Sequence, residues 1–421
     1  MSLLREKNAD KYILIAICVL LCVILSVCCA PAAFAEGNSG VTYMTLEEYA
    51  EQYPLQAADW MKEKEDDGIC MAPTSMQRHW TNICAMAFGM DGIPVACGTC
   101  HMSNIGQALD EYGTDIFMMT DTQLKEKTGF EAEYMGCGVC HDPADMSKVT
   151  PNTTGTSYFA TDPNSKFPER DATCGQCHSA FDGQIFAVRD DLKIDIYQYG
   201  TDADSVLKAM RESWETYPQE LTAEEMALGY NVGFPMYDEA IDAVLFGYST
   251  ENTAVETFQG SMHQKMGLSC VDCHMPQTTD EASGVTYTSH SPSFSPLENE
   301  DALNYCLTCH QALSKIATTD EMVTFVQGKM TELGARQAEV HAELNELYAA
   351  LAEATTNGNV EEATLEAARN AYVTANFYWN FEKGTAQHED VGNEAAHNFK
   401  GSTELLDKAE ALVLPAIESL K

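Results

Sequence analysis

Basic side chains are scarce in this sequence. Lysine and arginine together number 24, against 64 aspartates and glutamates, and the formal net charge is −40. A charge of this sign and size repels phosphate groups, so nucleic acid and anionic lipid surfaces are excluded as partners. We expect a partner with a basic docking face instead.

Several familiar functional signatures are also missing. The sequence contains no glycine-rich dinucleotide motif, no phosphate-binding loop and no Ser-His-Asp order. Hydrophobic residues nevertheless make up 45% of the 421 positions. This composition predicts a globular chain rather than a disordered one, with one large domain or two ordinary ones.

The N-terminal 35 residues have the pattern of an export segment. Three basic residues precede an uncharged run over residues 12–35, which ends in Ala33-Phe34-Ala35 and predicts cleavage before Glu36. The run is also long enough for an uncleaved membrane anchor, whereas bulky Val27 disfavours a lipid anchor at the cysteines that follow it. In each case the remainder of the chain lies outside the cytoplasm, in the periplasm or on the outer face of the membrane.

Five Cys-x-x-Cys-His motifs stand out in the sequence. Chance predicts about 0.02 of them at this composition. Two thiols three positions apart can form thioethers to haem, and the adjacent histidine can bind the iron. Zinc knuckles or disulfides would not explain the histidine beside each pair. We therefore predict five covalent haem c groups, attached at Cys97, Cys100 and His101; Cys137, Cys140 and His141; Cys174, Cys177 and His178; Cys270, Cys273 and His274; and Cys306, Cys309 and His310.

Six histidines remain outside the motifs. The chain has only 11 histidines, so haem ligation is the main reason to expect them. The candidates for distal iron ligands are His79, His263, His290, His341, His388 and His397. Two cysteines between the export segment and the first motif, Cys70 and Cys84, can form a disulfide in an exported protein.

The spacing of the motifs and the pattern beyond them predict the architecture. The first cysteines are 40, 37, 96 and 36 residues apart, which excludes a regular solenoid. The long gap contains an acidic stretch, residues 201–230, that reads as two short helices. Apolar residues at helical spacing predict a helix over 319–354 with Thr319 as N-cap, and two more helices end near Lys383 and Leu420. We predict a mainly α fold with three parts: 1–35, the export segment; 36–310, a compact haem-binding body; and 311–421, a helical tail that carries a distal ligand and a dimer face.

The chain resembles the ammonia-forming pentahaem cytochrome c nitrite reductases. The resemblance rests on the order and spacing of the motifs, on CGQCH followed by an aromatic residue and Asp-Gly, on MHQK before SCVDCHMP, on YTSH and on the tail segment with His397-Asn398. It implies distal ligands for four irons: His290 for the haem of His141, His79 for that of His178, His397 for that of His274 and His263 for that of His310. It also implies a homodimer formed partly by the C-terminal helices.

This sequence departs from the family pattern where the family binds and reduces its substrate. His101 replaces the lysine that most members use at the first haem, and Ala180 and Phe181 replace a glutamate and a tyrosine. The family's arginine is missing, because residues 80–97 contain no arginine or lysine. A cation and proton donors are needed for nitrite reduction. The family's calcium site, which uses some of the same positions, is also expected to be lost.

Two functions remain open on the sequence alone. The first is an electron-transfer cytochrome of anaerobic respiration, with a membrane quinol-oxidising cytochrome as donor and an exported reductase as acceptor. It requires a sixth ligand at the haem of His101, from His341, His388 or a methionine. The second is an enzyme that still reduces nitrite, or another small substrate, at the haem attached by Cys97 and Cys100, with Phe181 nearby. No catalytic residue is assigned.

Overall fold

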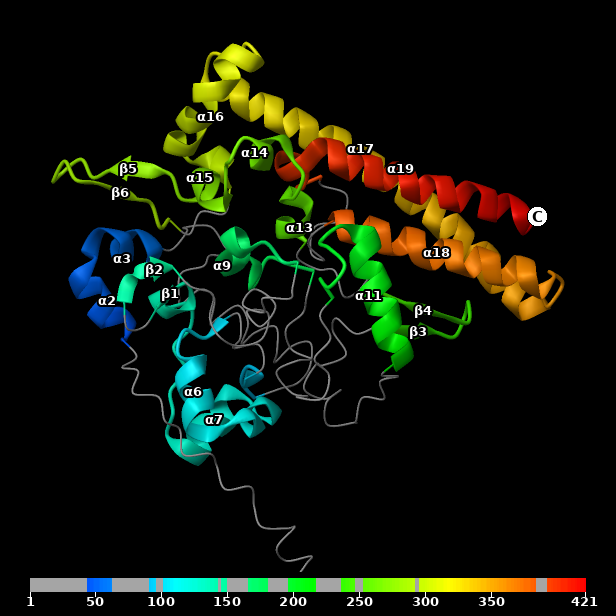
Figure 1. The fold of residues 1–421 in the computed structure, drawn as a ribbon, viewed down its shortest axis with the longest axis horizontal. Coiled ribbons are helices and arrows are strands. Elements are labelled where there is room, and N and C mark those ends of the chain that lie inside the picture. The colour runs from blue at the N-terminus through cyan, green and yellow to red at the C-terminus, as the bar shows by residue number, and fades with distance from the viewer. Residues whose placement is uncertain are drawn as a thin grey trace, which may run out of the picture.

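The computed structural model describes most of the chain after residue 43 and shows a mainly α-helical protein (Figure 1). The N-terminal run over residues 12–35 lies outside the described part. Within the described residues, no helix combines the length and the apolar character needed to span a membrane. The described ranges are 44–62, 91–95, 101–142, 145–149, 166–180, 196–216, 236–246, 253–291, 295–383 and 392–421.

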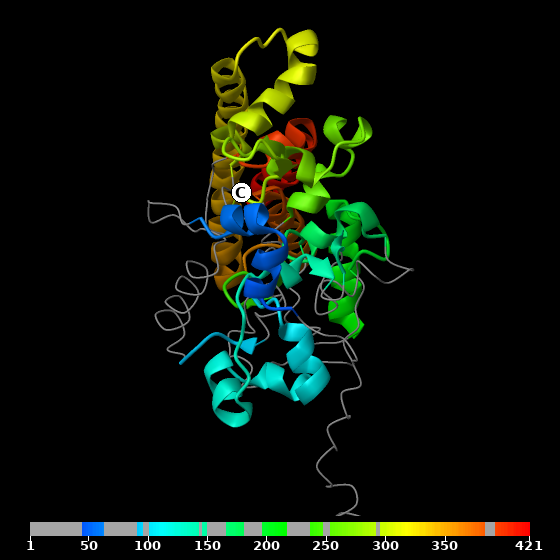
Figure 2. The ribbon, with the colours of Figure 1, turned by 90° about the vertical axis from the view of Figure 1, so that its left-hand side faces the viewer.

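Short helices build the part of the chain that holds the Cys-x-x-Cys-His motifs. Helices α6 and α7 lie at the opposite end of the molecule from α16 (Figures 1 and 2). Local capping explains where some of these helices begin, because Thr45 and Thr120 form capping boxes at α2 and α7. The elements are α2 (Leu46–Gln52), α3 (Pro54–Trp60), α6 (Ile105–Tyr112), η2 (Thr114–Met118), α7 (Asp121–Thr128), η3 (Cys137–Val139), η4 (Glu169–Asp171), α9 (Ala172–Gly175), α11 (Ala203–Thr216), α13 (Ala254–Phe258), α14 (Met262–Lys265), α15 (Cys270–His274), η6 (Pro296–Glu298) and α16 (Glu300–Leu313).

Three antiparallel hairpins interrupt the helices in the described residues. They pair β1 (His141–Asp142) with β2 (Asp145–Val149), β3 (Met236–Asp238) with β4 (Ala243–Leu245), and β5 (Gln277–Thr279) with β6 (Thr286–Thr288). In the third hairpin, Gln277 faces Thr288 and Thr279 faces Thr286. The hairpins matter for the site because β1 begins at His141 and β6 leads directly to His290.

Three long helices form the C-terminal part, as the sequence predicts. They are α17 (Thr319–Asn357), α18 (Glu362–Lys383) and α19 (Ala395–Ser419). The predicted N-cap is wrong by one residue, because Thr318 rather than Thr319 caps α17 and forms a capping box with Glu321. Gly358 ends the helix with a positive φ of 60°, a conformation that glycine adopts without strain.

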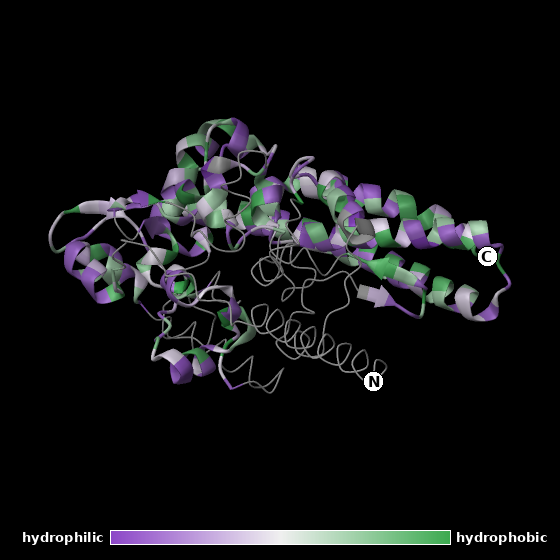
Figure 3. Ribbon diagram, turned by 60° about the horizontal axis from the view of Figure 1, so that its bottom comes forward, coloured by the Kyte–Doolittle hydropathy of each residue, from purple (hydrophilic) through white to green (hydrophobic). Residues whose placement is uncertain are grey.

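The main hydrophobic core lies between these three helices and extends into the preceding part of the chain, the haem-motif body, which holds the Cys-x-x-Cys-His motifs. Leu344, Leu347 and Leu351 of α17 are buried in it with Phe377 of α18 and Leu406 of α19. Figure 3 shows hydrophobic residues alternating with hydrophilic ones along the three helices, as expected for helices that bury one face.

One residue of the apolar spacing in α17 lies at the surface, and one expected helix is only partly described. Phe325 is 40% exposed, and its ring lies 5.9 Å from that of His310. In the acidic stretch, α11 supplies the first of the two predicted helices. The second falls on residues outside the described part.

Replacing Leu347 with alanine should destabilise the helical core strongly. The side chain is fully buried among the three helices, and a buried Leu→Ala change typically costs about 2–5 kcal/mol. Denaturant unfolding followed by far-ultraviolet circular dichroism measures the loss. Leu414→Ala is the matched control, because Leu414 of α19 is 46% exposed. Equal losses for the two variants would contradict the packing described above.

Candidate haem sites

The haem motifs in the described residues lie on short helices or helical turns. The fourth motif forms α15, and the fifth lies in the second half of α16. The second motif begins in η3, and the third overlaps the end of α9. Because one helical turn brings positions i and i+3 to the same face, the two thiols of each motif can meet one flat ligand. Of the first motif, His101 is described, and Cys97 and Cys100 are not.

The eight motif cysteines in the described residues are free thiols. Burial raises the pKa of Cys137 to about 11 and that of Cys273 to about 12. Thiols with such raised pKa values carry little thiolate at neutral pH and are poor redox or nucleophilic sites. Among the described residues, no group of three or more histidine, cysteine, aspartate or glutamate side chains is arranged to bind a metal ion. Pairs of unoxidised thiols followed by histidine fit covalent haem.

Three pairs of histidine rings face each other at one common separation. The ring centres of His141 and His290 are 6.2 Å apart, as are those of His274 and His397, and those of His263 and His310. Imidazole nitrogen binds a first-row metal at about 2.0–2.1 Å, so two axial rings on one metal have centres roughly 6 Å apart. Each pair therefore has the separation that one shared iron requires.

The first pair is held in place by a buried carboxylate. Asp59 of α3 accepts hydrogen bonds from Ser289 Oγ and from the backbone N–H of His290, both at 2.8 Å. Burial raises the pKa of Asp59, but hydrogen bonds from Lys62, Ser289 and His290 outweigh it and hold the pKa below its ordinary value. The His290 Nδ1 lies 2.8 Å from the Thr288 carbonyl. With Nδ1 donating there, Nε2 is left to bind a metal.

The other two pairs share the beginning of α19. His397 Nδ1 lies 2.7 Å from Glu394 Oε2. Burial lowers the pKa of the His263 ring, and the backbone of Ala396, one residue before His397, opposes this shift. A single short segment therefore orients one histidine of each of two pairs.

Some predicted site residues cannot be placed, and one has another packing partner. His79, His388, Phe181, Cys70 and Cys84 lie outside the described residues. The ring of His341 stacks on that of Trp379, with centres 4.3 Å apart and planes 29° apart, between α17 and α18. Trp379 is thus the aromatic packing partner of His341.

A buried carboxyl group lies beside the third motif, close to Ala180. Glu256 of α13 accepts hydrogen bonds from the Ala180 backbone N–H at 2.7 Å and from the Tyr197 hydroxyl at 2.5 Å. Glu256 is only 4% exposed. Desolvation raises its pKa to about 7. No sequence signal joins residues so far apart, since Glu256 and Ala180 are separated by 76 positions.

The raised pKa of Glu256 predicts a pH dependence of stability that Glu256→Gln should remove. Between the ordinary pKa of 4.5 and the folded value of about 7, the folded state alone keeps this proton. The stability contribution therefore falls as the pH rises through this window, by at most about 1.4 kcal/mol per pH unit. Glutamine still accepts both hydrogen bonds, but it does not ionise.

Thermal unfolding of the holoprotein at a series of pH values checks this prediction. The expected result is a flatter decline of the midpoint for Glu256→Gln than for the wild type between about pH 5 and pH 7. Glu366→Gln is the control, because Glu366 is exposed on α18. Parallel curves for the wild type and Glu256→Gln would show that Glu256 is not protonated in the folded protein.

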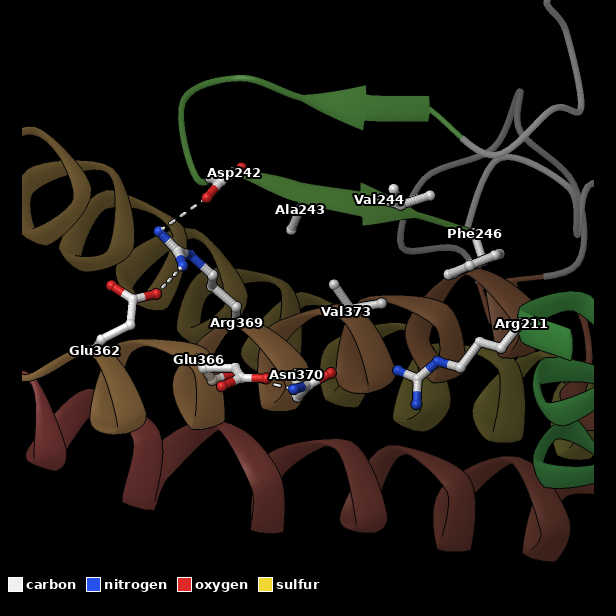
Figure 4. A pocket seen from close by; sticks show the side chains of 10 residues that line it. All are labelled: Arg211, Asp242, Ala243, Val244, Phe246, Glu362, Glu366, Arg369, Asn370 and Val373. Atoms are coloured by element: carbon white, nitrogen blue, oxygen red, sulfur yellow. Dashed lines mark hydrogen bonds and ion pairs between the residues drawn. The ribbon is translucent and has the colours of Figure 1, made fainter. Parts of the chain in front are cut away.

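A cavity of about 440 Å³ lies apart from the motifs, between the β3–β4 hairpin and α18. Its lining contains neither cysteine nor histidine. Arg369 Nη2 lies 3.4 Å from Asp242 Oδ2, and Arg369 Nη1 lies 3.0 Å from Glu362 Oε1 (Figure 4). Its Nε also donates to the Ile241 carbonyl at 2.8 Å. These bonds tie the hairpin to α18, so Arg369 has a structural role.

The comparisons of this sequence with known proteins indicate one family, the cytochromes c552. The model of the cytochrome c552 family matches residues 84–416. Cytochrome c-552 of Aliarcobacter butzleri is 25% identical over 53% of this chain and 42% of its own length. Cytochrome c-552 of Desulfotalea psychrophila is 25% identical over 59% of this chain and 50% of its own length. The matched part thus spans about half the length of these curated relatives.

A solved structure has the same fold. The catalytic subunit of the cytochrome c nitrite reductase from Desulfovibrio desulfuricans, described with two calcium sites, superposes with a TM-score of 0.62 over 90% of this chain and 88% of its own, at 17% identity. This likeness confirms the predicted multihaem cytochrome fold with long C-terminal helices. The thiols and histidines described above fit the covalent haem c that cytochromes c carry. Because the family model covers most of its length, the chain belongs to the cytochrome c552 family.

Proposed function

We propose that this chain is an exported pentahaem cytochrome that transfers electrons in anaerobic respiration, from a membrane quinol-oxidising cytochrome to a separate exported reductase. The histidine pairs are the observation that carries the proposal, because three ring pairs share a separation of 6.2 Å. An iron with protein ligands on both axial sides has no position for a substrate, so it can only pass electrons.

The chain's own residues hold and shape these sites. Haem c, when bound, supplies an iron that gains and loses one electron. The motif thiols attach it, and the paired histidines are its proposed axial ligands. The Thr288 carbonyl and the Glu394 carboxylate fix two of the rings through Nδ1. We further propose that His79 completes the haem of His178.

The haem of His101 decides between an electron carrier and an enzyme. We propose that its sixth position is closed by His341, His388 or a methionine. Two features support this proposal: the anion-binding arginine of the resembling family is missing, and the net charge of −40 disfavours an anionic substrate. Removing even one electrostatic donor from an active site typically lowers the rate by about 10² to 10³. We expect no bound calcium, because the family's glutamate and tyrosine are replaced at Ala180 and Phe181.

The alternative is an ammonia-forming nitrite reductase, or a reductase of another small substrate, at the haem of His101. One observation favours it. The Tyr197 hydroxyl and the Glu256 carboxyl form a buried hydrogen-bonded pair beside Ala180. Groups of this kind can deliver protons to a substrate, and Glu256, with a pKa near 7, can exchange one at neutral pH.

Spectroscopy of the purified holoprotein separates the two functions. The carrier predicts five low-spin haems by electron paramagnetic resonance and magnetic circular dichroism, and no oxidation of the reduced protein by nitrite. A high-spin haem together with rapid nitrite-dependent oxidation would reject the carrier in favour of the enzyme. Light scattering tests the proposed homodimer, and N-terminal sequencing of the exported protein tests cleavage before Glu36.

A further inference from the structure

One histidine differs from the others in the group that holds its ring. His397 Nδ1 lies 2.7 Å from a carboxylate oxygen, Oε2 of Glu394. Glu394 is only 4% exposed. An N–H···O distance of about 2.7–2.9 Å is typical of a charge-assisted hydrogen bond, which is roughly twice as strong as a neutral one.

The backbone around Glu394 is built to present this carboxylate to the ring. The Glu394 carbonyl accepts the N–H groups of His397 at 3.0 Å and of Asn398 at 2.9 Å. Asn398 then leaves the helical conformation, with φ −159° and ψ 68°. Its side chain donates to the Thr257 carbonyl of α13 at 3.1 Å and accepts from the Gly401 N–H at 3.1 Å. The kink fixes His397 relative to α13.

Gly392, two residues before Glu394, anchors the beginning of this segment. Its backbone N–H donates to Gln337 Oε1 of α17 at 3.0 Å. A Cβ at this position would lie 2.1 Å from the Met330 carbonyl oxygen, and the φ of 65° also favours glycine. The segment is therefore held against α17 at Gly392 and against α13 at Asn398. Because both ends are fixed, Glu394 has little freedom to move away from His397.

Three other rings of the proposed pairs have neutral partners. His290 Nδ1 faces the Thr288 carbonyl at 2.8 Å, and His310 Nδ1 lies 3.3 Å from the Ser314 hydroxyl. The backbone of Ala396 is the neutral group that acts on the pKa of the His263 ring. Among these four histidines of the described chain, a carboxylate partner is therefore particular to His397.

A buried carboxylate on an axial histidine changes the energy of the electron that the iron accepts. The oxidised iron and its ligands carry one more positive charge than the reduced ones, so the anion stabilises the oxidised state more. The low dielectric of the interior strengthens this effect. Hydrogen bonds from ligating histidines to carboxylates also raise the basicity of the ligand.

We propose that Glu394 is a positioning residue that lowers the reduction potential of the haem held by His274 and His397, so that this haem is reduced after those of His141 and His310. The inference rests on the axial pairs of the proposed function. Asp59 contacts the His290 loop through the backbone N–H, but the partners of the His290, His263 and His310 rings are neutral, so the other two haems lack a carboxylate on an axial ring. In a partly reduced molecule, the electrons then reside on haems other than the one held by His274 and His397.

Spectroelectrochemical titration of the holoprotein and of Glu394→Gln tests the proposal. Glutamine keeps the size and the acceptor oxygen but removes the charge. We expect the reduction equilibrium of one haem to become about tenfold more favourable, which is about 59 mV for a one-electron couple. The remaining potentials should stay within error. Glu394→Asp, which keeps the charge on a shorter side chain, should lie between the wild type and Glu394→Gln.

Glu256→Gln is the matched control. Glu256 is as buried as Glu394 and interacts with it electrostatically, but its hydrogen bonds go to Ala180 and Tyr197 rather than to a histidine ring. The titrations are run at about pH 9, where Glu256 with its pKa of about 7 is ionised. A shift in Glu256→Gln as large as that in Glu394→Gln would overturn the proposal, because the general negative field rather than the ring contact would then set the potential.

The spectra separate failure of this inference from failure of the proposed function. Should His397→Gly leave all haems low-spin, the axial pair itself is wrong and the proposal falls with it. Should His397→Gly convert one haem to high spin while Glu394→Gln moves no potential, the pair stands and the role of Glu394 is rejected. A single raised potential in Glu394→Gln with unchanged low-spin spectra supports both.

Discussion

Replacing His290 with glycine is expected to change one haem iron of the holoprotein from low spin to high spin. The ring of His290 faces that of His141 with the centres 6.2 Å apart and the planes within 24°. Removal of this ring opens one axial position, and the iron then has a single histidine or a weakly bound water. The change is all-or-none for that haem and appears in magnetic circular dichroism and electron paramagnetic resonance spectra.

Added imidazole provides the control for this variant. Glycine leaves a space of the shape of the lost ring, so free imidazole should restore the low-spin spectrum. Asp59 and Thr288, which hold the His290 loop, are unchanged in the variant. A spectrum of His290→Gly identical to that of the wild type would show that another side chain binds the iron of His141.

Removing both cysteines of the fourth motif, Cys270→Ala with Cys273→Ala, is expected to have the largest effect on stability. Intact mass should fall by one haem. His274 of α15 and His397 of α19 face each other across this site, so loss of the haem also removes one of the connections between α19 and the part of the chain that holds the motifs. The freed buried cavity adds a further penalty. The thermal midpoint measured by circular dichroism should fall well below that of the wild type.

The fifth motif provides the comparison. Cys306→Ala with Cys309→Ala also removes one haem, but the histidines concerned, His263 of α14 and His310 of α16, both belong to the body. Its loss should therefore cost less stability than loss of the fourth haem. A larger fall for the fifth-motif variant would contradict the bridging role of the site between α15 and α19.

Local patterns in the sequence were sufficient for the attachment motifs and the C-terminal helices. A Cys-x-x-Cys-His motif is read from five neighbouring residues, because its chemistry depends on one helical turn. Helices α17, α18 and α19 follow from apolar residues at helical spacing and from the break at Gly358. Even the error at the start of α17, Thr318 rather than Thr319, amounts to one residue.

Contacts between distant residues could not be found in this way. Asp59 receives the His290 N–H from 231 positions away, and Glu256 meets Ala180 from 76 positions away. Sequence spacing carries no information about such pairs, because they depend on how the helices pack. For the same reason, the apolar spacing along α17 does not show that Phe325 lies exposed beside His310.

The sequence by itself determined the chemistry that this protein can hold: the thiols and histidines for covalent haem, the acidic surface charge, and the helices of the tail. Only the tertiary structure decided which histidine rings face each other and which group holds each ring. Attachment depends on residues adjacent along the chain. The ring pairs and the bond from His397 to Glu394 depend on helix packing and on the kink at Asn398, which bring these groups together in space.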